Sequence, residues 1–245
     1  MQLSVTESFV ANVVEPFEQQ CGATVELFAF PAATTRTDLD NCMSWLDLLS
    51  EKLGRDRLRL FQPCITTSQD DGVRQALRLF RRTADVSVYS YIMMVRLDYT
   101  FTLPVIQWVD TDWSRFNFLS KCERHCGLDT PPGTCTKSGG DPPRCVNDML
   151  HTMPGAYFSG FDLAISGPPL IEPLIECYIR DGVKECGGCF RGSDHGTGHH
   201  FCFSAIEVAI HITSGNATRD PIIGFVTAWR PQKSVREWSP IGHVN

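Results

Sequence analysis

The sequence lacks any apolar run long enough to cross a membrane, since none approaches the roughly 20 residues that a spanning helix requires. It also lacks an excess of basic residues, because 22 Lys and Arg stand against 28 Asp and Glu, which gives a net charge of -6. A general nucleic-acid binder usually presents a basic face, so this balance argues against such a partner. We therefore expect a globular chain with no membrane span and no role in nucleic-acid binding.

Cysteine, by contrast, is abundant: the chain has 11, and eight of them lie between positions 122 and 202. Dense cysteines in a Gly- and Pro-rich setting are typical of disulfide bonds formed in an oxidising compartment. The sequon Asn216-Ala-Thr218 agrees with this. We expect a protein of the Golgi or endoplasmic-reticulum lumen, or a secreted one, whose targeting segment is absent from this chain. A cytoplasmic protein is the alternative.

One cysteine group also has the residue types of a zinc site. Cys186-Gly-Gly-Cys189 is followed by three histidines and a further cysteine, namely His195, His199, His200 and Cys202. Cys and His are the usual zinc ligands, but common zinc patterns place the second pair about 12–20 residues on. Here His199 follows Cys189 by only ten residues. The spacing therefore favours disulfides and leaves a Cys/His zinc site as an open alternative.

Helical and strand-like patterns alternate over about the first 110 residues, which is typical of βαβ units. The patterns predict three helices and three strands, at residues 4–21, 37–53 and 68–83 and at residues 24–30, 57–61 and 92–95 respectively. Thr37 and Ser68 are the expected helix caps. We expect one α/β domain over residues 1–245, with a mostly parallel, Rossmann-like sheet flanked by helices. Such a fold begins with a strand, so we also expect a segment missing upstream.

The second half is less regular. Residues 121–144 are too long for an ordinary connection, and residues 186–200 read as a second irregular insert. Cysteine-rich loop inserts are therefore expected in the C-terminal half. Between and after them the pattern predicts a short helix at 147–151, a helix or strand at 202–212 and a strand at 222–228.

The apolar run at residues 91–95 ends in Arg96-Leu-Asp98. In open α/β sheets, ligands bind in the crevice beyond the carboxyl ends of the strands. Two residues apart on an extended segment, Arg96 and Asp98 would point the same way. One would suit a phosphate and the other a metal ion or a sugar hydroxyl. A surface ion pair at a strand end is the alternative, and the spacing does not separate the two.

Several phrases resemble a family of nucleotide-sugar-dependent glycosyltransferases. They are Asn12-Val-Val-Glu-Pro-Phe17, Val25-Glu-Leu-Phe28, Val95-Arg-Leu-Asp98 with Phe101 and Pro104-Val-Ile-Gln-Trp108 after it, and Arg144-Cys-Val-Asn-Asp-Met-Leu150. The resemblance covers roughly the first 165 residues and implies a GT-A-like fold. It makes residues 1–120 the nucleotide-sugar-binding half and residues 121–245 the acceptor-side half. The implied partners are a nucleotide-sugar donor and a glycan or protein acceptor.

The resemblance also implies roles for single residues. Arg96 would contact a diphosphate oxygen, Trp108 would contribute to donor binding, and Asp98 would hydrogen-bond the donor or coordinate a metal. Asp148 would act as general base or bind the acceptor hydroxyl, and His199 would be a second metal ligand. Two alternatives stay open: Asp148 as a helix cap and Trp108 as a core anchor.

The chain departs from the family in lacking Asp-x-Asp at the end of the strand. Arg96-x-Asp98 supplies one carboxylate, and Asp110-x-Asp112 has the spacing but falls in the following loop. A hard cation such as Mn²⁺ or Mg²⁺ wants several oxygen ligands, so Arg96 would supply part of the charge neutralisation. The rival function is a non-catalytic, disulfide-rich secreted module that binds carbohydrate or protein.

Overall fold

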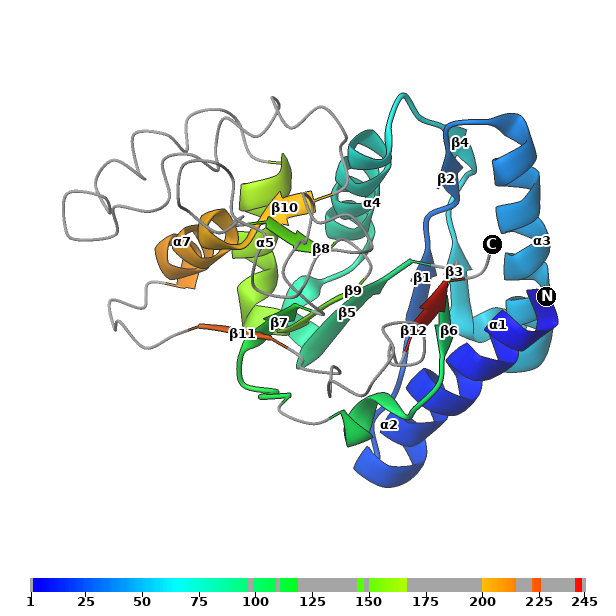
Figure 1. The fold of residues 1–245 in the computed structure, drawn as a ribbon, viewed down its shortest axis with the longest axis horizontal. Coiled ribbons are helices and arrows are strands. Elements are labelled where there is room, and N and C mark those ends of the chain that lie inside the picture. The colour runs from blue at the N-terminus through cyan, green and yellow to red at the C-terminus, as the bar shows by residue number, and fades with distance from the viewer. Residues whose placement is uncertain are drawn as a thin grey trace, which may run out of the picture. The chain divides into compact units, whose positions relative to one another are not determined.

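The computed structural model describes residues 2–96, 99–108, 111–118, 145–147, 150–166, 200–214, 222–225 and 241–243. They form a mixed α/β protein of helices and small sheets (Figure 1). Contacts divide the chain into two compact units. Unit 1 comprises Met1–Arg82, Arg96–Asp110 and Thr227–Asn245, and unit 2 comprises Thr83–Val95 and Thr111–Val226. The prediction of one domain with two halves meeting near residue 120 stays a prediction.

Unit 1 begins with a helical segment in three parts: α1 (Gln2–Phe9), a π-helical turn η1 (Val10–Val14) and α2 (Glu15–Cys21). This confirms the helix expected at 4–21, although the π turn was not foreseen. Gly22 ends the segment in the left-handed conformation at φ 63°, which glycine adopts without steric cost. A π turn places one extra residue in the helix, and such turns are frequent at functional sites.

Two parallel strand pairs follow one another in unit 1. Strand β1 (Leu27–Ala29) pairs with β3 (Leu58–Leu60), and β2 (Ala32–Ala33) pairs with β4 (Cys64–Ile65). The main-chain hydrogen bonds continue between the pairs, since Cys64 N–H donates to the carbonyl of Pro31 at 3.0 Å. Pro31 itself has no N–H to offer and interrupts the ladder there. The strand signals at 24–30 and 57–61 are therefore confirmed as a parallel arrangement.

Helix α3 (Arg36–Leu53) packs on β2 and β4, and helix α4 (Gln69–Thr83) packs on β1, where the Phe80 ring meets Phe28 edge-on at 4.9 Å. The α3 face that points inward carries Leu39, Trp45, Leu46 and Leu49, all buried at helical spacing. The predicted cap Thr37 is wrong: Thr35 Oγ1 accepts the Asp38 N–H at 3.1 Å, so the helix begins earlier. Ser68 caps α4 as expected, because its Oγ accepts the Asp71 N–H at 3.2 Å.

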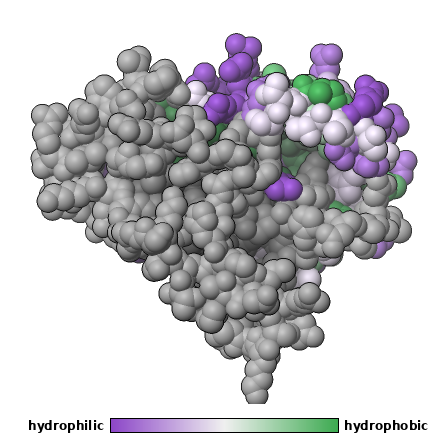
Figure 2. All heavy atoms as spheres, turned by 45° about the horizontal axis from the view of Figure 1, so that its top comes forward, coloured by the Kyte–Doolittle hydropathy of each residue, from purple (hydrophilic) through white to green (hydrophobic). Residues whose placement is uncertain are grey.

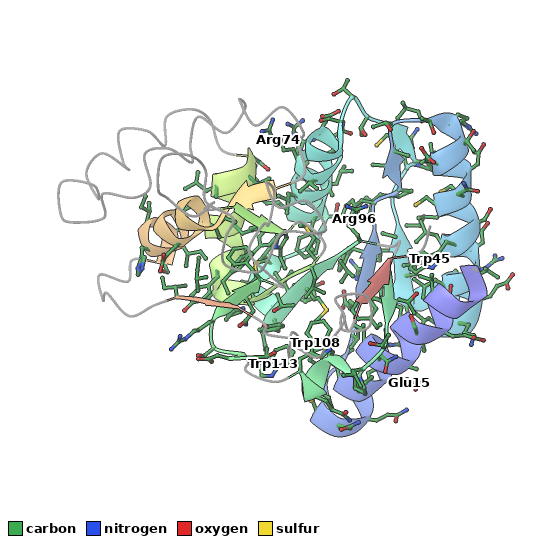
Figure 3. The ribbon with its side chains drawn as sticks, in the orientation of Figure 1. Glu15, Trp45, Arg74, Arg96, Trp108 and Trp113 are labelled. Carbon is green, nitrogen blue, oxygen red and sulfur yellow. The ribbon has the colours of Figure 1, made fainter. Side chains whose placement is uncertain are left out.

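A further part of unit 1 contains β6 (Tyr99–Phe101), the short helix η4 (Val105–Gln107) and β12 (Ile241–His243), which pairs antiparallel with β6. Among the described side chains, four aromatic rings pack against one another here. Phe9 contacts Trp45 with ring centroids 6.2 Å apart and Phe101 at 5.9 Å, both edge-on, and Phe101 stacks on Trp108 at 6.2 Å. Trp45 comes from α3, so this core joins α1, α3 and β6 (Figure 3).

Unit 2 is built on a four-stranded sheet of order β11-β7-β9-β5, from Ile223–Phe225, Phe116–Phe118, Leu150–Pro154 and Tyr91–Val95. Only β11 and β7 run parallel; β9 is antiparallel to both β7 and β5. The expectation of a single, mostly parallel Rossmann-like sheet is therefore corrected. The run at 91–95 is a strand, as predicted, but in the described residues its neighbour is the antiparallel β9.

The helices of this unit that the structure describes include α5 (Phe158–Ser166) and α7 (Phe203–Ser214), with the 3-10 turns η3 (Val86–Val88) and η5 (Gly155–Tyr157). Helices α5 and α7 pack closely at Gly160, where an added Cβ would lie 2.4 Å from Ile210 Cα. A second, two-stranded sheet pairs β8 (Cys145–Asn147) with β10 (His200–Cys202). The short helix predicted at 147–151 is wrong, because both neighbouring segments, β8 and β9, are strands.

The described surface visible in Figure 2 is mostly hydrophilic, with a small hydrophobic area. The large hydrophobic side chains exposed in the described residues are Leu60, Ile65, Val88 and Leu103. Single exposed apolar residues are normal for globular proteins. Within the described parts of the chain, no helix is both long and apolar enough to span a bilayer.

Candidate functional site

Of the predicted site residues, Arg96 and Trp108 are described. Asp98, Asp148 and His199 lie outside the described residues, as does Asp110 of the second acidic pair. Arg96, labelled in Figure 3, follows β5 directly and is half-buried. The structure therefore places the arginine at the strand end that the sequence predicts. Its pairing with a donor or with Asp98 stays a prediction.

The segment that follows Arg96 and Asp98 is tied to the N-terminal helix through its main chain. Asn12 Nδ2 donates to the carbonyl of Phe101 at 2.7 Å, although the two residues are 89 positions apart. Phe101 N–H donates to Ser8 Oγ at 3.1 Å, and that hydroxyl donates to the Val5 carbonyl at 3.0 Å. Asn12 belongs to the π turn η1. Both main-chain groups of Phe101 are thus satisfied by side chains of one helical segment.

Trp108 occupies the core of the same region. It is 6% exposed, and its indole ring lies nearly parallel to the Phe101 ring, with an interplanar angle of 7°. This placement agrees with the core-anchor alternative, because a ring that is buried against Phe101 contributes to the hydrophobic core of unit 1. Its Nε1 has no hydrogen-bond partner among the described atoms. A role for Trp108 in donor binding stays a prediction.

Asp112 has a local structural role. Its Oδ1 accepts the Ser114 N–H at 3.0 Å, and its Oδ2 pairs with Arg115 Nε at 2.8 Å. The hydrogen bonds from Ser114 lower the pKa of Asp112. A carboxylate that accepts a main-chain N–H two residues on forms an Asx turn. The described half of Asp110-x-Asp112 is therefore engaged in shaping the loop before β7.

A polar cluster in unit 2 was missed by the sequence reasoning. Tyr91 Oη donates to Thr152 Oγ1 at 3.0 Å, and its ring meets Trp113 edge-on at 5.1 Å. Asn117, the register partner of Thr152, donates through Nδ2 to the carbonyls of Asp112 and Arg115 at 2.8 and 2.9 Å. Burial raises the pKa of Tyr91, so its hydroxyl stays protonated at neutral pH. Tyr91, Thr152 and Asn117 come from three strands, and no sequence pattern joins them.

His151 is the second group that the sequence reasoning missed. It is fully buried among three phenylalanine rings, with centroids 6.2 Å from Phe116, 5.5 Å from Phe118 and 5.4 Å from Phe161. Desolvation in this apolar setting lowers its pKa to about 3. The imidazole is therefore neutral at physiological pH. Such a histidine serves packing in unit 2.

A shallow groove of about 330 Å³ lies at the amino ends of β1 and β3, lined by Glu18, Thr24, Val25, Glu26, Asp56, Arg57 and Arg59. Its charges are largely paired, since Arg57 bonds to Glu18 and Arg59 lies 3.5 Å from Glu26. Ligands of α/β sheets bind at the carboxyl ends of the strands. The groove is at the opposite end, so we do not assign it as the donor site.

The cysteines whose side chains the structure describes are Cys21, Cys42 and Cys64, and each is a free thiol. Burial raises the pKa of Cys42. The disulfides and the zinc alternative predicted for residues 122–202 concern side chains outside this set. Among the described side chains, no group of three or more His, Cys, Asp or Glu is arranged to hold a metal.

Comparisons of the chain with protein-family models, curated proteins and solved structures find no match. The candidate site therefore rests on the residues of this chain. The structure brings Asn12, Phe101 and Trp108 together in unit 1. Arg96 directly follows β5 in the chain.

Proposed function

We propose that this protein transfers a sugar from a nucleotide-sugar donor to a glycan or protein acceptor. In this proposal unit 1 contributes to a GT-A-like donor site, with Arg96, Asp98 and Trp108 on the donor side. Asp148 is the proposed general base. Mn²⁺ or Mg²⁺ is the proposed cation, with Asp98 and His199 as ligands, in a lumenal or secreted protein.

The observation that carries the proposal is the hydrogen bond from Asn12 to the Phe101 carbonyl. Asn12 opens the first family-like phrase, and Phe101 follows Arg96-Leu-Asp98 in a later one. Phe101 in turn stacks on Trp108, the end of the next phrase. Phrases that resemble one family and lie far apart in the sequence thus belong to one packed cluster. Their packing in one cluster supports a common role for these segments.

The cluster bears on Arg96 through strand β6, which follows it in the chain. Strand β6 begins at Tyr99 and is fixed through both main-chain groups of Phe101. A preorganised segment loses less entropy when it binds a ligand. An arginine at its start offers a planar fork that matches two phosphate oxygens, and partial burial strengthens that contact. Arg96 would thus bind the diphosphate of the donor, which becomes the leaving group.

Donor binding is the direct test. The oxidised full chain is titrated with UDP-, GDP- and CMP-sugars, each with and without Mn²⁺, while the melting temperature is followed. A donor at 100 times its dissociation constant would add about 2.7 kcal/mol to the free energy of unfolding. We expect one nucleotide class to stabilise the protein. Metal dependence of that shift would indicate an ion at Asp98.

Two arginine variants sharpen the test. Arg96→Gln should raise the dissociation constant of that donor at least tenfold, because a charge-assisted, bidentate contact is lost. Arg82→Gln, at an exposed position near the end of α4, should leave it unchanged. Absence of binding to every donor, with the protein folded, would favour the carbohydrate- or protein-binding module instead.

A further inference from the structure

The two-stranded sheet of unit 2 brings two cysteines into register. In the antiparallel pair of β8 and β10, Cys145 is the partner of Cys202, Val146 of Phe201 and Asn147 of His200. The two cysteines are 57 positions apart in the sequence. Directly opposite residues of an antiparallel pair also lie on the same face of the sheet. The backbone therefore places these cysteines as direct cross-strand neighbours.

This placement fits the geometry of a disulfide bond. Opposite residues in antiparallel ladders have Cα atoms about 4.5 or 5.5 Å apart, depending on the hydrogen-bonding pattern. Disulfides span Cα separations of about 4.4–6.8 Å, so either position is compatible. We propose that Cys145 and Cys202 are joined by a disulfide bond that links β8 to β10.

The cysteine count agrees with this pairing. The chain has 11 cysteines, and Cys21, Cys42 and Cys64 are free thiols. Removing these three from 11 leaves eight, an even number that allows complete pairing in the second half. The odd total is then explained by thiols of unit 1, and Cys145 with Cys202 forms one of the pairs.

The bond has a structural purpose in unit 2. Strands β8 and β10 have three residues each, and an isolated two-stranded ladder is marginally stable. Cys202 directly precedes α7, whose Ile206, Ala209 and Ile210 are buried where α7 packs on α5. A covalent link at the start of α7 closes a long loop and reduces the entropy of the unfolded chain. The link also fixes β8, which directly precedes Asp148 in the sequence.

The bond forms by thiol–disulfide exchange with an incoming disulfide, such as a protein disulfide donor of an oxidising compartment or oxidised glutathione. The thiolate of one cysteine attacks a sulfur of the donor and forms a mixed disulfide, releasing one donor thiol. The second cysteine then displaces the other donor thiol. Two protein thiols are oxidised, and one donor disulfide is reduced to two thiols.

Peptide mapping tests the bond directly. The full chain, purified after expression in an oxidising compartment, is alkylated in denaturant and digested with trypsin and cyanogen bromide without reduction. Cleavage after Arg144 and Met149 separates Cys145 from Cys177, and residues 192–219 contain Cys202 as their one cysteine. We expect residues 145–149 linked to 192–219, and loss of that species on reduction. Alkylated Cys145 and Cys202, or linkage of either to another cysteine, would overturn the proposal.

Thiol counting in denaturant gives an independent readout that does not require the variants to fold. The unmodified chain should have three free thiols, from Cys21, Cys42 and Cys64. Cys145→Ser should raise the count by one, because Cys202 loses its partner, and adding Cys202→Ser should restore it. Cys42→Ser, the matched control, should lower it by one. An unchanged or lower count in Cys145→Ser, or both thiols free once a chelator has removed bound zinc, would contradict the disulfide.

Discussion

In the residues that the structure describes, unit 1 and unit 2 are built in different ways from helices and strands. In unit 1, parallel strands alternate with α3 and α4 along the chain, and side chains of the N-terminal helix hold β6 through its main chain. In unit 2, the sheet joins β5, β7, β9 and β11 from distant parts of the sequence, and most of their pairs are antiparallel. The helices α3 and α4 and the parallel strands of unit 1 follow local sequence patterns, whereas the four-stranded sheet of unit 2 depends on pairing between distant segments. The two should therefore respond differently to substitution.

The largest difference between the two units is expected in how a Gly→Ala substitution within a helix changes the free energy of unfolding. Gly160→Ala in α5 would put a Cβ 2.4 Å from Ile210 Cα and 2.6 Å from Ile210 N, both main-chain atoms that cannot swing away. We expect it to lower the free energy of unfolding by about 3 kcal/mol or more, or to prevent folding of unit 2. Urea unfolding followed by circular dichroism measures this.

Gly72→Ala in α4 of unit 1 is the matched control. There the nearest atom to the added Cβ is Ala32 Cβ at 3.4 Å, an ordinary contact. Alanine is the better helix former, so this variant should gain about 0.5–1 kcal/mol. Equal effects of the two substitutions would contradict the close approach of α5 and α7.

The second prediction concerns the pH dependence of the free energy of unfolding, to which the buried His151 of unit 2 contributes. The pKa of His151 is about 3 in the folded protein and near its ordinary 6.5 when unfolded, so the unfolded state binds more protons in between. Its contribution to stability is present above pH 6.5 and is lost as the pH falls toward 3, by about 2 kcal/mol at pH 5. His151→Phe, which cannot titrate, should lack this component when urea unfolding is compared at pH 7 and pH 5. An identical pH dependence in both proteins would show that His151 is solvated.

The third prediction concerns the cluster that supports the proposed function. Asn12→Ala removes the donor to the Phe101 carbonyl and should lower the free energy of unfolding by about 1–2 kcal/mol. Asn12→Asp, which keeps the shape without the donor, should have an effect of similar size. Asn41→Ala, at an exposed position on α3, should change stability by less than about 0.5 kcal/mol. No loss in either Asn12 variant would mean that β6 is fixed by other contacts.

The smallest expected effect is in the polar cluster of unit 2. Tyr91→Phe removes the hydrogen bond to Thr152 Oγ1 and should cost about 1 kcal/mol. Thr152→Val removes the other partner. In a double-mutant cycle the two should show a coupling energy of about 1 kcal/mol, whereas strict additivity would exclude the bond in solution.

The sequence predicted most of the local structure of unit 1, because helical spacing and caps are encoded within a few residues. Even there, the predicted cap of α3 was Thr37, whereas Thr35 caps the helix. Both threonines precede acidic residues suited to the first turn, so the local sequence does not distinguish them. The apolar run Tyr91–Val95 was correctly read as a strand, but an apolar run does not specify whether its partner is parallel or antiparallel. Pairing in unit 2 is decided by contacts with β9, about 60 residues away, which periodicity does not encode.

The candidate site was predicted only in part, because the sequence encodes local patterns but not contacts between distant residues. Arg96 was found because it ends an apolar run, and Asn12 appeared in a family-like phrase without an assigned role. Its hydrogen bond to Phe101 spans 89 positions and carries no local signature. His151 was missed because a buried histidine in a strand looks like any polar residue in the sequence.

The most direct test of the central claim is release of the nucleotide from a nucleotide sugar, measured with the oxidised full chain and glycan or protein acceptors. We expect acceptor-dependent release with one donor class. Asp98→Asn should reduce it at least a hundredfold, and Asp40→Asn, which removes an exposed ion pair with Arg36, should not change it. Folded protein that releases no nucleotide with any donor and acceptor, or release that is unaffected by Asp98→Asn, would contradict sugar transfer at this site.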